Sequence, residues 1–188
     1  MLALSAAELT VLDWIAVHCR TPWLDAVVPW ITYLGSFGAV WIELALLLLS
    51  RKSQRACGIQ VALALIFSLL LCNLILKNAV SRIRPFELAG IQDLLIPVPM
   101  DTSFPSGHTS ASFAAAAVLF LERHPLRWLA LVLACLISLS RLYLYAHYPT
   151  DVAAGALVGV LCGVLAVTIW KKILSPRLSG RGEEKGTC

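Results

Sequence analysis

Long apolar segments recur along this chain, and charged residues are mostly confined to the breaks between them. Membrane proteins show this pattern because the hydrocarbon core, about 30 Å thick, accepts only apolar helical segments of matching length. With 59% hydrophobic and 14% charged residues, the chain is too apolar for the polar surface of a soluble domain. We predict an all-α integral membrane protein, a helical bundle of about five transmembrane helices. The expected spans are residues 31–50, 56–76, 108–121, 126–143 and 151–170.

The two ends of the chain differ from this bundle. Residues 1–30 carry charged side chains among Leu, Val, Ile and Trp, so they are too polar to span and are expected to form an amphipathic interfacial helix. Residues 31–174 would then form the membrane domain. The tail, residues 175–188, is rich in Gly, Arg, Lys and Glu and is expected to be disordered in the cytoplasm.

Basic residues in the breaks indicate an orientation, because cytoplasmic loops carry an excess of Lys and Arg. Such groups occur at residues 51–55, 123–127 and 171–185, which places these ends in the cytoplasm. The remaining basic residues at span ends fall on the outer side, where a ligand explains them better than topology does. We therefore expect a multi-pass protein of the cell membrane with an extracytoplasmic site. The residues concerned are Lys77, Arg82, Arg84 and Arg141.

Three clusters of polar residues would meet at that outer face. Arg84 and Arg141 offer planar, permanently charged forks for phosphate or carboxylate oxygens, and Lys77 supplies a movable point charge. Ser106 and Gly107 open the span at residues 108–121, where the free backbone amides of a helix start favour an anion. Gly107 also lets the backbone come close to a ligand. The sequence therefore predicts a composite anion-binding site.

Two histidines give this site the means for catalysis. His147 and Asp151 are four residues apart, so they share one face if the turn is helical, and Asp151 could accept a proton from one imidazole nitrogen. The other nitrogen would be free to attack phosphorus. His108, at the start of another helix, could protonate the departing oxygen. The expected chemistry is phosphoryl transfer to His147, followed by hydrolysis.

These residues resemble the three-part signature of the type-2 phosphatidic-acid phosphatase superfamily, K-x6-R-P, P-S-G-H and S-R-x5-H-x3-D. The first part is Lys77 with Arg84 and Pro85, the second is residues 105–108, and the third is Ser140 and Arg141 with His147 and Asp151. The resemblance covers roughly residues 24–172 and leaves the amino-terminal arm and the tail without motif support.

The resemblance assigns a role to each site residue. It implies that Lys77, Arg84 and Arg141 hold phosphate oxygens and that Ser106 and Gly107 donate further hydrogen bonds. His147 would be the nucleophile, Asp151 its orienting partner and His108 the acid for the leaving group. No metal or other cofactor is implied, and the carboxylates are too scattered for a paired-metal site.

The resemblance also implies a small lipid phosphatase, with the lipid bilayer and a lipid phosphate as partners and no nucleic acid. Undecaprenyl diphosphate is the expected substrate, and phosphatidylglycerol phosphate and phosphatidate remain alternatives because no residue selects a polyprenyl chain. From a different class, a transporter or binding protein could use the same basic residues without turnover. The His147 and Asp151 pair separates these readings, because hydrolysis needs a nucleophile and binding needs only charge.

Gly155, Gly159 and Gly163 recur every four residues, and the span at residues 108–121 is equally slim at residues 114–117. This pattern predicts close helix packing, either within one subunit or across a homodimer face. Residues 86–104 are long for a turn. They are expected either to lie over the site and help choose the lipid, or to be a plain connection.

Two charged residues fall outside the signature. Arg82 is expected to face lipid headgroups, with attraction of a second phosphate as the alternative. Glu43 falls well inside a span, where an unpaired carboxylate is costly, so we expect it to face the bundle, protonated or hydrogen-bonded, near Asn73, with a proton-transfer role as the alternative.

Overall fold

The computed structural model describes residues 2–175, with side chains from Ser5 onward. The expected disordered tail therefore lies outside the described residues, apart from Ser175. Within the described part the chain is helical and contains no strand. The α-helices are α1 (Leu2–His18), α2 (Pro22–Leu34), α3 (Ala39–Ser50), α4 (Arg55–Ser68), α5 (Lys77–Val80), α6 (Pro85–Leu88), α7 (Gly107–Leu121), α8 (Arg127–Tyr143) and α9 (Pro149–Ile169). Shorter 3₁₀ or π segments are η1 (Ser36–Gly38), η2 (Lys52–Gln54), η3 (Leu69–Leu76) and η4 (Trp170–Leu174).

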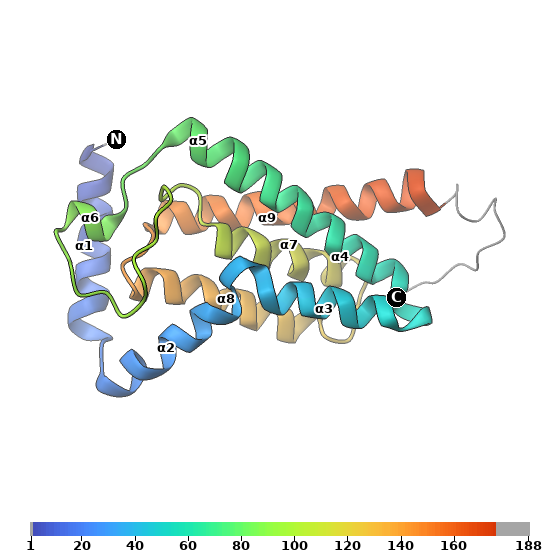
Figure 1. Cartoon of the computed structure of the whole chain (residues 1–188), viewed down its shortest axis with the longest axis horizontal. Helices are drawn as coiled ribbons and strands as arrows, with labels where there is room; N and C mark the ends of the chain where they lie inside the picture. Colours follow the sequence, from blue (N-terminus) through green and yellow to red (C-terminus); the bar gives the residue numbers. More distant parts are fainter. Residues whose placement is uncertain (1, 176–188) are drawn as a thin grey trace.

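Five helices run along the long axis of the molecule and form the bundle: α3, α4, α7, α8 and α9 (Figure 1). Helix α1 crosses one end of this bundle, and α2 leads from it to α3 (Figure 1). The core lies around α7, whose small residues Ala114 and Ala115 are fully buried. An all-helical bundle is therefore confirmed.

The number of membrane spans is judged from the length and apolar composition of the helices. Among the described residues, Lys52–Leu88 and Pro149–Leu174 are long and apolar enough to cross a membrane, and the pair Pro22–Leu34 and Ser36–Ser50 adds a third if it counts as one span. Helix α7 has 15 residues, which gives about 22 Å at the usual helical rise. Helix α8 has 17 residues and carries an Arg in its first and last turns. The predicted count of about five is not confirmed.

A break separates α2 from α3 and bends the two helices by 44°. Phe37 and Gly38 both have left-handed backbone there, with φ of 53° and 71°, which ends one helix and starts the next at a new angle. Because α2 continues to Leu34, the interfacial arm and the first expected span share one helix across residue 30. The break brings Ser36 toward the start of α7.

The glycines of α9 pack against α7 within the same chain. A Cβ built on Gly155 would lie 2.6 Å from the carbonyl oxygen of Ser106, and one on Gly163 would lie 2.7 Å from the Cβ of Ala117. These distances leave no room for a side chain. The stripe therefore serves the intrasubunit packing that the sequence predicts, and a homodimer stays an untested prediction.

Gly159→Ala is expected to lower the free energy of unfolding by about 1–3 kcal/mol, the usual cost of overpacking. The new methyl group would meet the backbone nitrogen of Ala114 at 2.9 Å, so α7 and α9 must separate. Thermal unfolding of the detergent-purified variant measures this. Ala153→Leu, which adds more volume on the exposed side of α9, is the control. Equal unfolding temperatures for both variants would contradict this packing.

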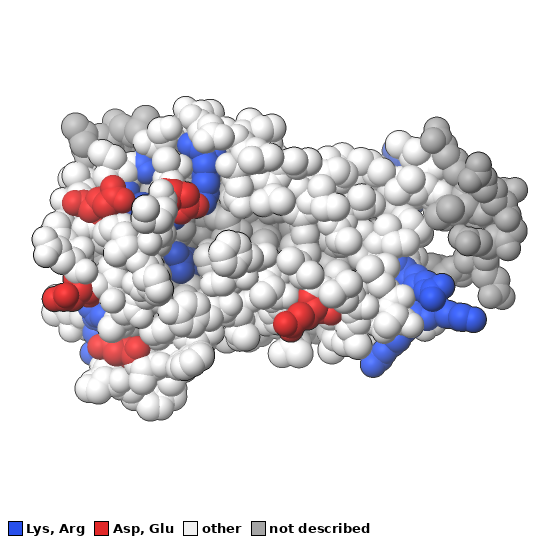
Figure 2. All heavy atoms as spheres, in the orientation of Figure 1, with Lys and Arg blue, Asp and Glu red and all other residues white. Residues whose placement is uncertain are grey.

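Charged side chains gather at the two ends of the molecule, with a largely uncharged surface between them (Figure 2). Arg51, Lys52 and Arg55 are exposed at the end away from α1. Glu43 corrects our expectation, because it is exposed. Helix α3 buries Trp41, a residue on the opposite face, so Glu43 points out of the bundle.

Candidate active site

The sequence-predicted site residues meet at the end of the bundle that α1 covers. Lys77 begins α5, Arg84 precedes α6, Gly107 and His108 form the first turn of α7, Arg141 lies in the last turn of α8, and His147 precedes α9. These residues line a cavity of about 990 Å³. Segments that are far apart in sequence therefore converge on one site. The predicted site residues that line the cavity are Lys77, Arg84, Gly107, His108, Arg141 and His147.

His147, which lines the cavity, faces Asp151, which does not line it. The Nδ1 atom of His147 lies 3.7 Å from Oδ2 of Asp151, a charge contact longer than a hydrogen bond. Such contacts often shorten only when substrate is bound. On the other side of the ring, Nε2 lies 3.3 Å from Nη1 of Arg84. The ring thus turns one nitrogen to the carboxylate and the other to the phosphate-suited cations.

Asp151 is held by donors from three directions. Ser103 donates to Oδ2 at 2.5 Å, the backbone N–H of Tyr148 donates to Oδ2 at 3.0 Å, and Nη1 of Arg82 donates to Oδ1 at 2.7 Å. The carboxylate is fully buried. Since it does not line the cavity, Asp151 can orient His147 without touching a ligand.

Burial disfavours the charged form of the His147 imidazole. Burial lowers its pKa to about 3, and the charges of Arg84 and Arg141 add to this effect while Asp151 opposes it. When the proton of a neutral imidazole is on Nδ1, toward Asp151, the Nε2 atom carries a free lone pair. A nucleophile attacks with such a lone pair, so Nε2 is the candidate attacking atom.

His108 lines the cavity from the first turn of α7. Its Nε2 atom lies 3.4 Å from Oγ of Ser36, which belongs to the break between α2 and α3. The sequence offered no signal for Ser36, because only the bend of 44° brings it here. Ser36 is therefore a neighbour of the candidate acid that sequence reasoning missed.

Asp101 is paired with two of the cations that are predicted to bind phosphate, Lys77 and Arg84. Asp101 forms ion pairs with Lys77 and, at 2.5 Å, with Nη2 of Arg84. Burial alone raises the pKa of Asp101, but the hydrogen bonds and charges of Lys77 and Arg84 outweigh it and lower the pKa to about 2. Asp101 is thus ionised and holds the place that phosphate oxygens would take.

Asp101→Asn is expected to strengthen phosphate binding several-fold, because a competing negative charge is removed from Lys77 and Arg84. The constant for competitive inhibition by inorganic phosphate measures this and should fall by about threefold to tenfold. Asp93→Asn, on the same loop but without such an ion pair, serves as the control. An unchanged inhibition constant would show that Asp101 does not compete with the anion.

Arg141 has no carboxylate partner among the described residues. It is buried, and Nη1 donates to Oγ1 of Thr32 at 2.7 Å while Nε has no partner. A buried, uncompensated guanidinium is costly and calls for an anionic ligand. Arg141 is therefore a buried cation suited to a negatively charged ligand.

Ser106 and Gly107 differ in the positions they take. Ser106 is buried, caps α7 by accepting from Thr109, and does not line the cavity. The hydroxyl accepts in this cap and its proton is still available, so the hydrogen bond from Ser106 to phosphate stays a prediction. Gly107 does line the cavity, and a Cβ there would lie 2.8 Å from Oδ1 of Asn73.

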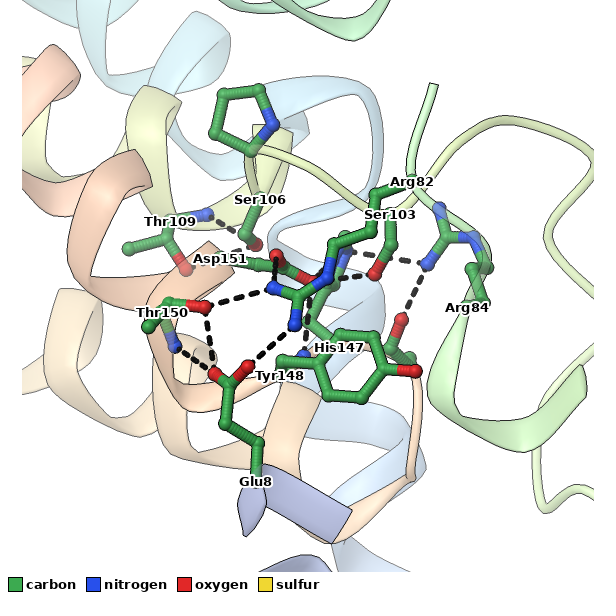
Figure 3. A network of polar contacts seen from close by, with 12 residues as sticks. Glu8, Arg82, Arg84, Ser103, Ser106, Thr109, His147, Tyr148, Thr150 and Asp151 are labelled. Carbon is green, nitrogen blue, oxygen red and sulfur yellow. Dashed lines mark hydrogen bonds and ion pairs between the residues drawn. The ribbon is translucent and has the colours of Figure 1, made fainter. Parts of the chain in front are cut away.

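Arg82 corrects the sequence interpretation. It does not face lipid headgroups: it is buried, and Figure 3 shows its guanidinium between Glu8 and Asp151. Its planar head also lies 3.8 Å from the ring centroid of Tyr148. Glu8, one of the two carboxylate partners, comes from α1, which belongs to the amino-terminal arm without motif support. Spacing along the chain gives no signal for this contact.

The segment at residues 86–104 lies over the site. Ile96, Pro97 and Met100 line the cavity, as does Asp101, whose contacts with Lys77 and Arg84 are described above. The position over the site that the sequence predicts is therefore confirmed. Whether the segment chooses the lipid stays a prediction.

The apolar helical bundle and the buried histidine near Arg84 and Arg141 are the features expected of a membrane phosphatase. The sequence profile of the PAP2 superfamily matches residues 58–174, more than half of the chain. The chain belongs to this superfamily.

Named relatives agree with this class. An undecaprenyl-diphosphatase of Sulfolobus acidocaldarius is 35% identical over 73% of this chain and 68% of its own. Phosphatidylglycerophosphatase B of Bacillus subtilis is 29% identical over 84% and 81%. The crystal structure of Aquifex aeolicus LpxE superposes with a TM-score of 0.73 at 31% identity, covering 85% of this chain and 94% of that one. The named relatives therefore support the assignment of the chain to this superfamily.

Proposed function

We propose that this protein hydrolyses undecaprenyl diphosphate to undecaprenyl phosphate through a phosphohistidine intermediate, without a metal, at the extracytoplasmic face. The observation that carries the proposal is the shape of the cavity, which joins a cationic end to a long apolar groove. The groove runs between α3 and α4 as far as Leu49, about 16 Å from Gly38 along α3. Its apolar lining includes Ile42, Leu46, Leu49, Leu65, Ile66 and Leu69.

This shape fits a molecule with a phosphate head and a hydrocarbon tail. The head would meet Arg141, the buried guanidinium without a carboxylate partner, while the tail lies against apolar side chains. A soluble phosphate ester would leave the groove empty. The relatives named for undecaprenyl diphosphate and phosphatidylglycerophosphate support a lipid of this kind.

The residues divide the chemistry as follows. Nε2 of His147 attacks phosphorus, the P–O bond to the leaving group breaks, and His108 supplies the proton to the departing oxygen. Arg84 and Arg141 balance the charge that develops on the phosphoryl oxygens, and Asp151 stabilises the positive imidazole ring. Water then gives a proton back to His108 and attacks phosphorus, the P–N bond to His147 breaks, and inorganic phosphate leaves.

The orientation rests on the basic ends described above. Arg51, Lys52 and Arg55 lie at the end opposite to the site, which supports a cytoplasmic position for that end and an outer position for the cavity. The cavity would then meet the lipid carrier in the outer leaflet.

Phosphate release from a panel of lipids tests the function. Purified protein in detergent is given undecaprenyl diphosphate, phosphatidylglycerol phosphate, phosphatidate and, as a control without a tail, glycerol phosphate, all with EDTA present. We expect the fastest release from undecaprenyl diphosphate and little from glycerol phosphate. Faster release from a diacyl lipid would mean that this lipid, and not undecaprenyl diphosphate, is the substrate. Binding of a lipid without release of phosphate would favour a transport or binding role.

A further inference from the structure

Arg82 connects Asp151, the partner of the candidate nucleophile His147, to α1. Its Nη1 atom donates to Oδ1 of Asp151 at 2.7 Å and to Oγ1 of Thr150 at 2.8 Å. Its Nη2 atom donates to Oγ of Ser5 at 2.9 Å. The same atom donates to the carboxylate of Glu8 (Figure 3). Ser5 and Glu8 belong to α1, and Thr150 and Asp151 belong to the first turn of α9. Arg82, in the loop at residues 81–84, contacts both helices.

Glu8 is fixed from its other side as well. Its Oε1 atom accepts from the backbone N–H of Thr150 at 2.8 Å and from the Thr150 hydroxyl at 2.6 Å. Glu8 is 6% exposed and Arg82 is 7% exposed, so water screens this network little. A headgroup-facing helix would not need these bonds. The amino-terminal arm is therefore part of the site's support.

The charges in this network are unequal. One guanidinium faces two buried carboxylates, Glu8 and Asp151. Because Glu8 takes up part of the positive charge of Arg82, Asp151 keeps more of its negative charge available for His147. Without Glu8, Arg82 would neutralise Asp151 more completely, and the positive imidazole that forms in the reaction would be less stabilised.

We propose that Glu8 and Arg82 are positioning residues for the reaction at His147, which they reach through Asp151. Arg82 holds the carboxylate in place, and Glu8 sets how much of its charge reaches the imidazole ring. The inference rests on the proposed role of His147 as the nucleophile. It extends the active site to α1, which lies outside the matched residues 58–174.

Other charged groups around His147 must be kept constant in a test. They come from the loops and from the ends of α5, α7, α8 and α9, and none of them is changed in the variants below. They are Lys77, Arg84, Asp101, His108, Arg141 and Asp151.

The test is the dependence of kcat on pH, with the lipid that the wild-type protein hydrolyses fastest. In the substrate complex, the bound phosphate raises the pKa of His147, so the acid limb of the profile reports on that residue. Glu8→Gln keeps the shape and the acceptor for Thr150 but removes one negative charge. We expect the acid limb to move to lower pH by about half a unit or more, and kcat to fall about tenfold with little change in KM.

Arg82→Gln should move the acid limb in the opposite direction, to higher pH, because a positive charge near His147 is lost. Arg82→Lys keeps the charge and should keep the limb at its wild-type position. A merely structural role would lower activity without these opposite shifts. If Glu8→Gln does not fold, as judged by thermal unfolding, the two Arg82 variants decide the question alone.

Glu122→Gln is the matched control, because Glu122 pairs with Lys171 at 2.9 Å at the far end of the bundle. It should leave the profile unchanged. An acid limb that stays in place in both Glu8→Gln and Arg82→Gln, or moves the same way in both, would overturn the inference while leaving the phosphatase intact. Wild-type protein without turnover on any lipid would instead remove the proposed function and the inference together.

Discussion

His147→Ala is expected to reduce phosphate release from lipid substrate by at least about 1000-fold, the scale seen when a nucleophile or its base is removed. The reason is geometric: Nε2 of His147 faces Arg84 at 3.3 Å on the cavity side, and none of the other groups lining this end offers an imidazole next to a buried carboxylate. Substrate binding should persist, because Arg84 and Arg141 remain. Initial rates and the binding of a lipid phosphate by the same preparation measure both effects.

His18→Ala is the control for that result, because His18 is exposed at the end of α1 and stacks on Trp14 away from the cavity. It should retain wild-type rates. Turnover by His147→Ala at a rate close to wild type would mean that phosphorus is attacked by another group, water included, and that His147 only binds.

Arg141→Ala is expected to weaken substrate binding and turnover together, each by at least about tenfold, the cost of a lost charged hydrogen bond. Arg141 is the buried cation that the described residues leave without a carboxylate, so its removal takes away charge that Lys77 and Arg84 do not replace while Asp101 pairs with them. Arg141→Lys should recover only part of the loss, because a single ammonium lacks the planar fork.

The control lies on the same helix. Arg127→Ala, at the other end of α8, removes an Arg whose Nη1 atom donates to the backbone oxygen of Arg123. Its KM and kcat should match the wild type. A raised KM with unchanged kcat in Arg141→Ala would mean that Arg141 binds the ground state only and contributes nothing more at the transition state.

The sequence predicted the centre of the site because its residues form recognisable spacings. Charge at the ends of apolar runs predicted that Lys77, Arg84 and Arg141 meet, and the structure places all three on one cavity. The four-residue spacing of His147 and Asp151 likewise predicted their pairing, although α9 begins only at Pro149, so that His147 lies before the helix and not on one of its faces. Local rules suffice where the contacts lie close in sequence or at helix ends.

The supporting residues could not be predicted in this way. Glu8 is 74 residues from Arg82, and Asp101 and Ser103 sit in a loop without any periodic pattern. Their side chains become neighbours only when α1 crosses the end of the bundle and the loop folds over the cavity (Figure 1). Arg82 looked like a headgroup anchor because composition reports which charges exist but not which of them pair.

The fold was predicted in class but not in its span count. Hydrophobicity indicates helices in a bilayer, yet a helix buried among others can be short, as α7 is with 15 residues. The bend of 44° between α2 and α3 also has no clear sequence marker beyond Gly35 and Gly38. Packing against neighbouring helices, rather than propensity, decides these features.

The most direct test of the central claim is a search for the covalent intermediate. Wild-type protein is mixed with its best lipid substrate, quenched in alkali within a turnover, digested and analysed by mass spectrometry. We predict a phosphoryl group on His147 that is stable in alkali, is lost in acid and is absent from His147→Ala. Rapid turnover without any phosphorylated histidine, or with the phosphoryl group on His108, would contradict the assignment of His147 as the nucleophile.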